Sequence, residues 1–205
     1  MMNKTVLWAL ALAVLLGGAG LLYSNLAPKA EIAPPAPPAE DAVPAPDFTV
    51  YTEKGSGVKL SDFTGKPILV NFWASWCGPC KSEMPDLETI YNEYKEDVIF
   101  LMVNMTDGSA ETVEKASAYI AQQGYTFPVF YDTASSAAYA YAVTGIPTTV
   151  FIDSAGNISA ALSGAMGADS FRSYLDPLVE QSTASGLVAE PDDECGDGTT
   201  GFSFF

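Results

Sequence analysis

Apolar and polar positions follow two different periodicities between residues 47 and 182, and the combination is typical of an α/β domain. Residues 66–73 are a nearly continuous apolar run that starts at a Gly-Lys-Pro turn, which predicts a central strand buried on both faces of a sheet. In the next segment, 81–96, apolar residues recur at helical spacing. A helix is therefore predicted there, with a kink at Pro85.

The rest of this region continues the alternation of strand and helix. The expected elements are a β-hairpin from Phe48 to Leu60, strands at 98–103, 127–131, 148–152 and 158–163, and helices at 109–123, 134–142 and 168–181. Strands that alternate with helices, and then close with a hairpin and a helix, predict a mixed central sheet with helices on both faces.

The N-terminal residues show neither periodicity. The run from Val6 to Leu22 is apolar, uncharged and without an amphipathic pattern. Its length is close to the ~20 residues that span a bilayer, and it exceeds the ~7–15 residues of a signal-peptide core. We therefore expect residues 1–26 to form a transmembrane signal anchor, with Lys4 on the inner side and the rest of the chain exported. A cleaved signal peptide, with small residues at Gly18–Gly20, is the alternative.

Two further segments lack the features of a packed domain. Residues 27–46 alternate proline with alanine and glutamate, which predicts an extended polyproline II linker. Residues 183–205 contain acidic residues, no lysine or arginine, and a phenylalanine-rich end, which predicts a disordered acidic tail. The predicted organisation is an anchor, a linker, one folded domain at 47–182, and a tail.

The composition restricts the chemistry more than the fold. A formal net charge of -16, without any cluster of lysine or arginine, argues against a nucleic-acid partner. The chain contains no histidine, which excludes Ser–His and Cys–His nucleophilic pairs, histidine metal sites and haem ligation by histidine. We expect no cofactor and no metal, so the chemistry falls to cysteine, carboxylate, tyrosine or lysine.

The two cysteines of Trp76-Cys77-Gly78-Pro79-Cys80 are the main chemical signal. A structural zinc site needs four ligands, and the chain has neither a second CxxC pair nor a histidine. A purely structural disulfide across so short a loop would remove little entropy from the unfolded chain. The pair is therefore predicted to be redox-active, while Cys195 is left over.

The position of the pair, between a buried strand and a helix, predicts different roles for its members. Cys77 would lie at the helix N-terminus, where amides and the helix dipole stabilise a thiolate, and is expected to be the exposed nucleophile. Cys80, one turn further on, would be buried and would resolve the mixed disulfide. Gly78 permits close approach of a substrate, and Pro79 loses no hydrogen bond in the first helical turn. Trp76 is expected to shield the motif, with a plain core aromatic as the alternative.

Two sites outside the motif are further candidates. Glu83 follows Cys80 by three positions on the same side of the helix, and a buried carboxyl there could carry the proton of the resolving thiol. A solvated glutamate that complements the helix dipole is the alternative. Ile146-Pro147 directly precedes a predicted buried strand, where proline needs explaining because it has no N–H donor. A cis peptide bond is one explanation.

Taken together, these segments resemble the TlpA/ResA family of membrane-anchored thiol-disulfide oxidoreductases in the thioredoxin superfamily. The matching stretches are Asp47-Phe48, Leu60-Ser61-Asp62-Phe63, Gly65-Lys66-Pro67, Val70-Asn71-Phe72-Trp73-Ala74, Trp76-Cys77-Gly78-Pro79-Cys80, Glu83-Met84-Pro85, Gly124 with Phe127-Pro128, Gly145-Ile146-Pro147-Thr148-Thr149, and Ile152-Asp153 with Gly156. The resemblance implies a thioredoxin-like three-layer α/β fold with an added N-terminal β-hairpin and an insertion near residues 104–128, preceded by one transmembrane helix.

The resemblance also implies roles for particular residues. Pro147 would be cis and would face the cysteines, and backbone groups of Ile146 would pair with an extended substrate segment. Thioredoxins have a buried aspartate where this chain has Asn71, which cannot exchange a proton. Glu83 matches an acidic residue that the family carries near the active site, so it inherits the proton-transfer role.

The function and partners follow from the same resemblance. Family members act on disulfides of exported proteins, several of them on the haem-site cysteines of apocytochrome c, and are kept reduced by a membrane electron carrier of the CcdA/DsbD kind. We expect a monomeric disulfide reductase, anchored in the cell membrane by a single span, with its catalytic domain outside the cytoplasm. A disulfide oxidase or isomerase with this fold, and a non-catalytic tethered peptide-binding domain, are the alternatives.

Overall fold

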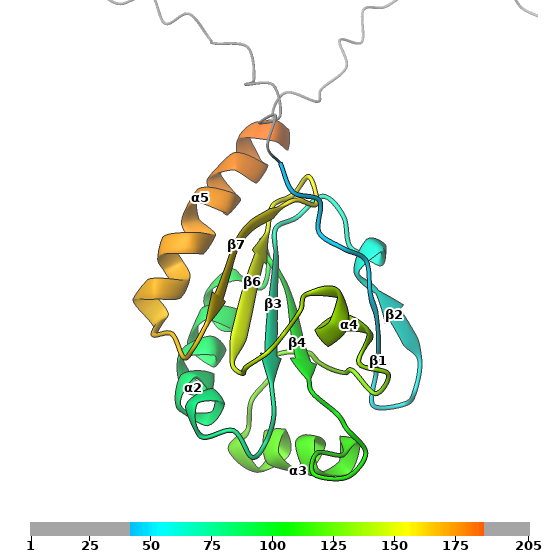
Figure 1. Cartoon of the computed structure of the whole chain (residues 1–205). Coiled ribbons are helices and arrows are strands. Elements are labelled where there is room, and N and C mark those ends of the chain that lie inside the picture. The colour runs from blue at the N-terminus through cyan, green and yellow to red at the C-terminus, as the bar shows by residue number, and fades with distance from the viewer. Residues whose placement is uncertain (1–41, 187–205) are drawn as a thin grey trace, which may run out of the picture. The chain divides into compact units, whose positions relative to one another are not determined.

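A seven-stranded mixed sheet is the centre of the domain in the computed structural model, which describes residues 42–186. Its strands are β1 (Thr49–Tyr51), β2 (Gly57–Lys59), β3 (Ile68–Trp73), β4 (Ile99–Asn104), β5 (Val129–Tyr131), β6 (Thr148–Ile152) and β7 (Ile158–Ser163). They lie in the order β2-β1-β5-β4-β3-β6-β7, with β3, β4 and β5 parallel and the other pairings antiparallel. The helices are α2 (Gly78–Tyr94), α3 (Val113–Gln123), α4 (Ser136–Ala140) and α5 (Ala168–Gly186), with a 3-10 turn at Leu60–Asp62 (Figure 1).

The side chains of β3 show why this sheet is covered on both faces. All six residues of the strand are buried, and successive side chains enter different cores. Leu69 and Trp73 belong to the core that includes residues of α2, α3 and α5. Ile68, Val70 and Phe72 belong to the opposite core, with α4 and the β1–β2 hairpin. The thioredoxin-like α/β fold with a mixed sheet, predicted from the apolar pattern and the family resemblance, is confirmed.

Helix α3 starts later than predicted, at Val113 instead of Ser109. Thr112 is its N-cap and accepts a hydrogen bond from a backbone amide of the first turn at 3.3 Å. The residues before it form a loop, because Asp107 Oδ1 accepts hydrogen bonds from the amides of Ser109 and Glu111 and so offers the backbone an alternative to the helix. This loop brings a buried carboxylate to the active site, as described below.

Both ends of the predicted domain extend further than the sequence indicated. Val43 O accepts a hydrogen bond from Ile158 N at 2.8 Å, so contacts with the sheet begin before Asp47. At the other end α5 continues to Gly186, into the predicted tail. The predicted anchor, most of the linker and most of the tail lie outside the described residues. Within the described range, no helix combines the length and apolar character needed to cross a membrane.

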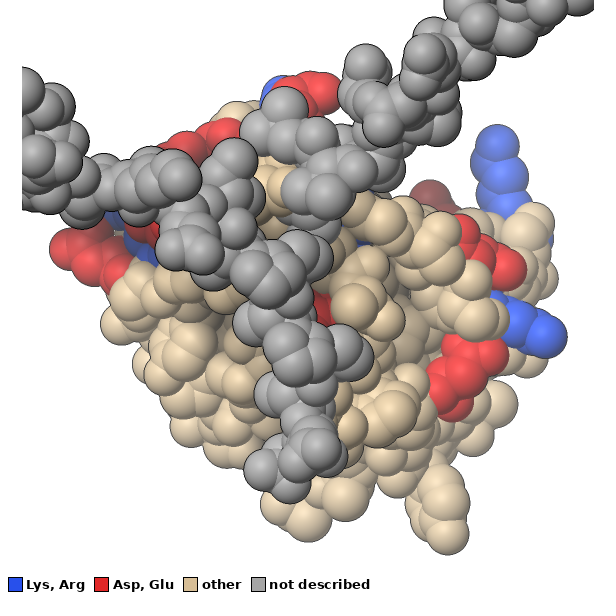
Figure 2. All heavy atoms as spheres, turned by 90° about the horizontal axis from the view of Figure 1, so that it is seen from above, with Lys and Arg blue, Asp and Glu red and all other residues tan. Residues whose placement is uncertain are grey.

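Charged side chains of both signs are scattered over the end of the domain seen in Figure 2. The few lysines and arginines on this face do not gather into a patch, and uncharged residues cover most of the visible surface of the described residues. On this face, the net acidity of the chain is therefore spread out rather than concentrated at one place.

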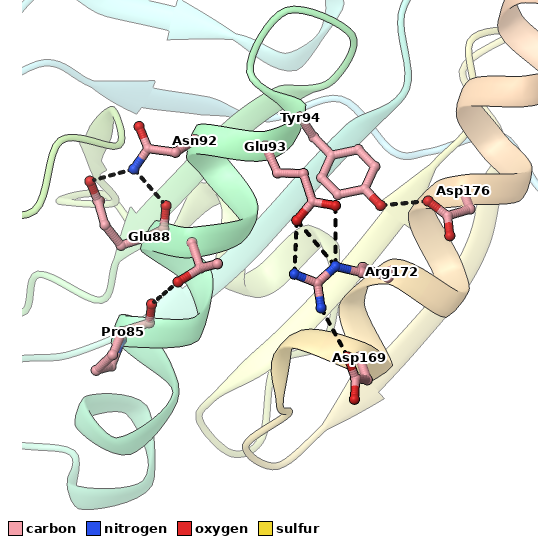
Figure 3. A network of polar contacts seen from close by, with 9 residues as sticks. Pro85, Glu88, Asn92, Glu93, Tyr94, Asp169, Arg172 and Asp176 are labelled. Atoms are coloured by element: carbon pink, nitrogen blue, oxygen red, sulfur yellow. Dashed lines mark hydrogen bonds and ion pairs between the residues drawn. The ribbon is translucent and has the colours of Figure 1, made fainter.

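A polar seam joins α2 to α5 (Figure 3). Arg172 on α5 forms ion pairs with Glu93 of α2 at 2.8 Å and with Asp169 at 2.9 Å. The hydrogen bond from Arg172 holds the pKa of Glu93 below its ordinary value. The Tyr94 hydroxyl donates to Asp176, and desolvation, followed by this hydrogen bond, raises the pKa of Tyr94. The seam links the C-terminal end of α2 to the N-terminal half of α5, and the two helices pack in one core.

Replacement of Arg172 by alanine should lower the free energy of unfolding only slightly, because exposed ion pairs are screened by solvent and order long side chains. Urea denaturation of Arg172→Ala, Glu93→Ala and the double variant would isolate the contribution of the pair. A coupling free energy as large as that of a buried ion pair would contradict this expectation.

Candidate active site

The two cysteines lie where β3 passes into α2. Cys77 is the N-cap of α2, and its amide donates a hydrogen bond to Ala74 O at 3.1 Å. Cys77 and Cys80 form a disulfide with an S–S distance of 2.07 Å. Cys80 N donates to Cys77 Sγ at 3.2 Å, so a thiolate formed at Cys77 would face the amides of the first helical turn. The predicted place of the pair is confirmed. Pro85 does lie within α2, and a kink there stays a prediction.

The disulfide is less exposed than the sequence suggested. Cys77 is 4% exposed and Cys80 is 0% exposed, so the expected exposed nucleophile is only slightly more accessible than its partner. Cys77 is part of the core that α2 shares with β3, and the Ile146 carbonyl oxygen lies 3.6 Å from its Sγ. The exposed rim of the site consists of Trp76, Gly78 and Pro79. The tryptophan is 59% exposed, so its alternative role as a core aromatic is wrong.

The Ile146–Pro147 peptide bond is cis, as the family resemblance implied. Pro147 is buried directly before β6, which is the antiparallel neighbour of β3. Its carbonyl accepts a hydrogen bond from Gly164 N at 2.8 Å. The backbone of half-buried Ile146 therefore lies beside Cys77, just before strand β6, which is paired with β3 on one side and β7 on the other.

Glu83 is buried one helical turn after Cys80 and is 1% exposed. Its Oε1 accepts a hydrogen bond from Asn71 Nδ2 at 2.9 Å, and its Oε2 accepts one from Met166 N at 3.0 Å. Burial raises the pKa of Glu83 to about 7, against the lowering effect of these two hydrogen bonds. The alternative of a solvated glutamate is therefore wrong.

Asn71 is suited to either protonation state of Glu83. Its Nδ2 also donates to Thr149 Oγ1 at 3.0 Å, while its Oδ1 has no hydrogen-bond partner among the described residues. If Glu83 Oε1 takes up a proton, rotation of the Asn71 amide presents Oδ1 as the acceptor, and Oε2 can still accept from Met166 N. Asn71 does not exchange the proton itself, but it can stabilise the group that does.

Sequence reasoning missed one buried acid of the site. Glu111 is 0% exposed and accepts hydrogen bonds from Ser75, two residues before Cys77. Its sequence position had suggested the first turn of a helix. The one available signal was an acid just before the capping residue Thr112, and that pattern does not distinguish a buried position from a solvated one.

These features define the class of the protein. A thioredoxin-like sheet presents a cysteine pair at a helix N-terminus, beside a cis proline and one turn from a glutamate with a pKa of about 7. This is the arrangement of a thiol–disulfide oxidoreductase.

Known proteins with similar sequences and structures give the same class. The family model described as Redoxin matches residues 39–176. Thiol-disulfide oxidoreductase ResA of Oceanobacillus iheyensis is 37% identical over 141 residues, which cover 67% of this chain and 72% of the relative. ResA of Bacillus thuringiensis subsp. konkukian is 30% identical over 178 residues, which cover 86% and 98%. The crystal structure of a thiol:disulfide interchange protein of the thioredoxin family from Chlorobium tepidum superimposes with a TM-score of 0.59 at 28% identity, over 67% of this chain and 97% of that one.

The chain therefore belongs to the redoxin family, among the ResA-like thiol-disulfide oxidoreductases of the thioredoxin superfamily. It is a thioredoxin-like protein disulfide oxidoreductase, and Cys77 and Cys80 are its cysteine pair.

Proposed function

We propose that this protein is a membrane-anchored reductase of protein disulfides that works outside the cytoplasm. The observation that carries the proposal is the buried Glu83, which lies one helical turn from the resolving cysteine. Its pKa of about 7 allows it to accept the proton of that thiol. The Gly78-Pro79 pair between the cysteines is the pair of general thioredoxins, whose potential of about -270 mV marks a reductant.

The reaction starts from the reduced pair. The Cys77 thiolate attacks one sulfur of a substrate disulfide, which forms a mixed disulfide and releases the first substrate thiolate. Cys80 then gives its proton to Glu83 and attacks Cys77 Sγ. This step forms the Cys77–Cys80 disulfide and releases the second substrate sulfur as a thiolate. Two electrons have passed to the substrate, and an external reductant must restore the pair.

The residues around the disulfide are proposed to bind the substrate. The Ile146 backbone lies beside Cys77 and would pair with an extended segment that carries the substrate cysteine. Pro147 holds this backbone in place. Exposed Trp76 would cover the substrate from the opposite rim, while Gly78 and Pro79 leave space for its backbone. Because Cys77 is only 4% exposed, the site would favour an extended segment over a folded surface.

The anchor and the partners come from the sequence and the family resemblance. The apolar segment at 1–26 would hold the protein in the membrane, and the proline-rich linker would let the domain reach exported proteins. A membrane electron carrier of the CcdA/DsbD kind would supply the electrons. The haem-site cysteines of apocytochrome c are one client class to be tested.

A Cys80→Ala variant should accumulate a mixed disulfide between Cys77 and its client, because the resolving thiol is absent. Non-reducing electrophoresis and mass spectrometry of trapped species from membrane fractions would identify the client. The Cys77→Ser/Cys80→Ala double variant is the matched control: it should lose every species trapped through Cys77, and any that remain are bound to Cys195. Capture of cytoplasmic proteins alone would contradict the proposed location, and a Cys77–Cys80 potential near about -120 mV would contradict the reductase direction.

A further inference from the structure

Glu111 lies in a loop, yet none of its surface is exposed. Its Oε1 accepts hydrogen bonds from Ser75 N at 2.7 Å and from Asn104 Nδ2 at 2.6 Å. Its Oε2 accepts one from Ser75 Oγ at 2.6 Å. Both oxygens are therefore engaged, and Ser75 is held through its backbone and its side chain at once.

The loop that carries Glu111 is itself tightly fixed. Asp107 Oδ1 accepts a hydrogen bond from Glu111 N at 2.9 Å, and Glu111 O accepts one from Asp107 N at 3.1 Å. Lys115 Nζ, from the first turn of α3, donates to the carbonyls of Ser109 and Ala110 at 2.9 Å each. Because the backbone on both sides of Glu111 is restrained, its carboxylate has little freedom to leave Ser75.

Asn104 connects this carboxylate to the sheet. It is the last residue of β4 and the partner of Trp73 in the parallel β3–β4 pairing. Thr106 Oγ1 donates to Asn104 Oδ1 at 2.8 Å, which fixes the amide so that its Nδ2 faces Glu111. Glu111 thus links the end of β4 to the segment by which the chain leaves β3 for the cysteines.

We propose that Glu111 is a positioning residue for thiol–disulfide exchange, which acts by holding Ser75 and thereby the turn that carries Trp76 and Cys77. Cys77 N donates to Ala74 O within this turn, so a displacement of Ser75 would pass directly to the nucleophile. Displacements of about 1 Å at a reacting atom can cost up to roughly a hundredfold in rate. The proposal concerns the exchange chemistry of the pair, so it holds for any client and for either direction of electron flow.

Glutamine at position 111 would separate the geometry from the charge. Its carbonyl oxygen can accept from Ser75 N and Asn104 Nδ2 as Oε1 does, and its amide can donate to Ser75 Oγ, which is able to accept. Alanine would remove all three contacts, and the donors Ser75 N, Ser75 Oγ and Asn104 Nδ2 would lose this acceptor. Glu114, in the first turn of α3, is an exposed glutamate close by and provides a matched control.

The test is the single-turnover reaction of the pre-reduced full-length protein with 5,5′-dithiobis(2-nitrobenzoate) and with insulin, expressed per folded molecule. Every protein compared carries Cys195→Ser, so that only the Cys77/Cys80 pair reacts. Glu111→Ala should react about 10- to 100-fold more slowly than wild type with both disulfides. Glu111→Gln should stay within about threefold of wild type, because its geometry is preserved. Glu114→Ala should be indistinguishable from wild type.

Equal rates per folded molecule for wild type and Glu111→Ala would overturn the proposal and leave Glu111 a role in stability only. If Glu111→Gln reacts as slowly as Glu111→Ala, the proposal is overturned, because the negative charge of Glu111, and not its hydrogen bonds, would then determine the rate. If Glu111→Ala does not fold, Ser75→Ala decides, since it removes only the contact with Oε2. It should be at least about twofold slower than the Glu114→Ala control, and an unchanged rate overturns the proposal. If the wild-type protein does not reduce insulin, that result contradicts the proposed reductase function and not the role of Glu111. The same variants are then compared in the opposite direction, as oxidised proteins that react with a dithiol peptide.

Discussion

Replacing Cys77 with serine should abolish disulfide reduction, the largest effect expected for any single side chain of this protein. Only a thiolate attacks a disulfide, and Cys77 is the cysteine at the N-cap of α2, where Cys80 N faces its sulfur at 3.2 Å. Cys80 cannot take over, because it is 0% exposed. Insulin reduction by the Cys77→Ser variant should fall to the rate without enzyme.

The fold should survive this substitution, so the loss can be assigned to chemistry. The disulfide closes a loop of only a few residues and constrains the unfolded chain little. Circular dichroism and a urea titration of Cys77→Ser would check this. Cys195→Ser is the matched control, since it removes a cysteine outside the pair, and its activity should be retained. Wild-type activity in Cys77→Ser would instead rule out the mechanism through Cys77 and Cys80.

The fold was predictable because its strongest signals are local. The buried run that became β3 is recognisable from six residues, and the cysteine pair from four more. Strand register and sheet order were not predicted, since β3 pairs with β6 across a long sequence separation and no local pattern links the two strands. The start of α3 was missed because one side chain, Asp107, competes with the helix for backbone amides.

The cysteines of the site were predictable, and their surroundings only in part. Spacing alone made Glu83 a candidate, but its pKa depends on burial and on a hydrogen bond from Met166, 83 positions away. Glu111 contacts Ser75 across 36 positions, and no pattern in the sequence links them. Carboxylates at first-turn positions look alike in a sequence, whether they are solvated or buried.

Glu83→Gln should slow the second step of the reaction and leave the first unchanged. Glutamine imitates the protonated glutamate, because its carbonyl can accept from Met166 N while its amide donates to a rotated Asn71 Oδ1. It cannot accept the proton of Cys80, and general-base assistance contributes at least about a hundredfold. In a Cys195→Ser background, where only the pair can react with 5,5′-dithiobis(2-nitrobenzoate), attack by Cys77 releases one thiolate and attack by Cys80 releases a second. Only the second release should be slowed, and its increase through about pH 7 should disappear.

The same variant tests whether the pKa of Glu83 is raised, through the pH dependence of stability. The folded protein raises this pKa from 4.5 to about 7, so between these values it binds more protons than the unfolded chain. The contribution of Glu83 to stability is therefore fully present below pH 4.5 and is lost as the pH rises towards 7, by about 3 kcal/mol in all. Carboxylates with lowered pKa values titrate below this window and affect both proteins alike.

Urea denaturation between pH 4.5 and 8 should show the wild type losing stability relative to Glu83→Gln across this window, and a constant difference above it. Glu93→Gln, an exposed glutamate on the same helix, should follow the wild type. Parallel curves for wild type and Glu83→Gln would show that the carboxyl titrates normally. It would then already be ionised when Cys80 has to lose its proton, and too weak a base to accept it, so another base would be needed for the resolving step.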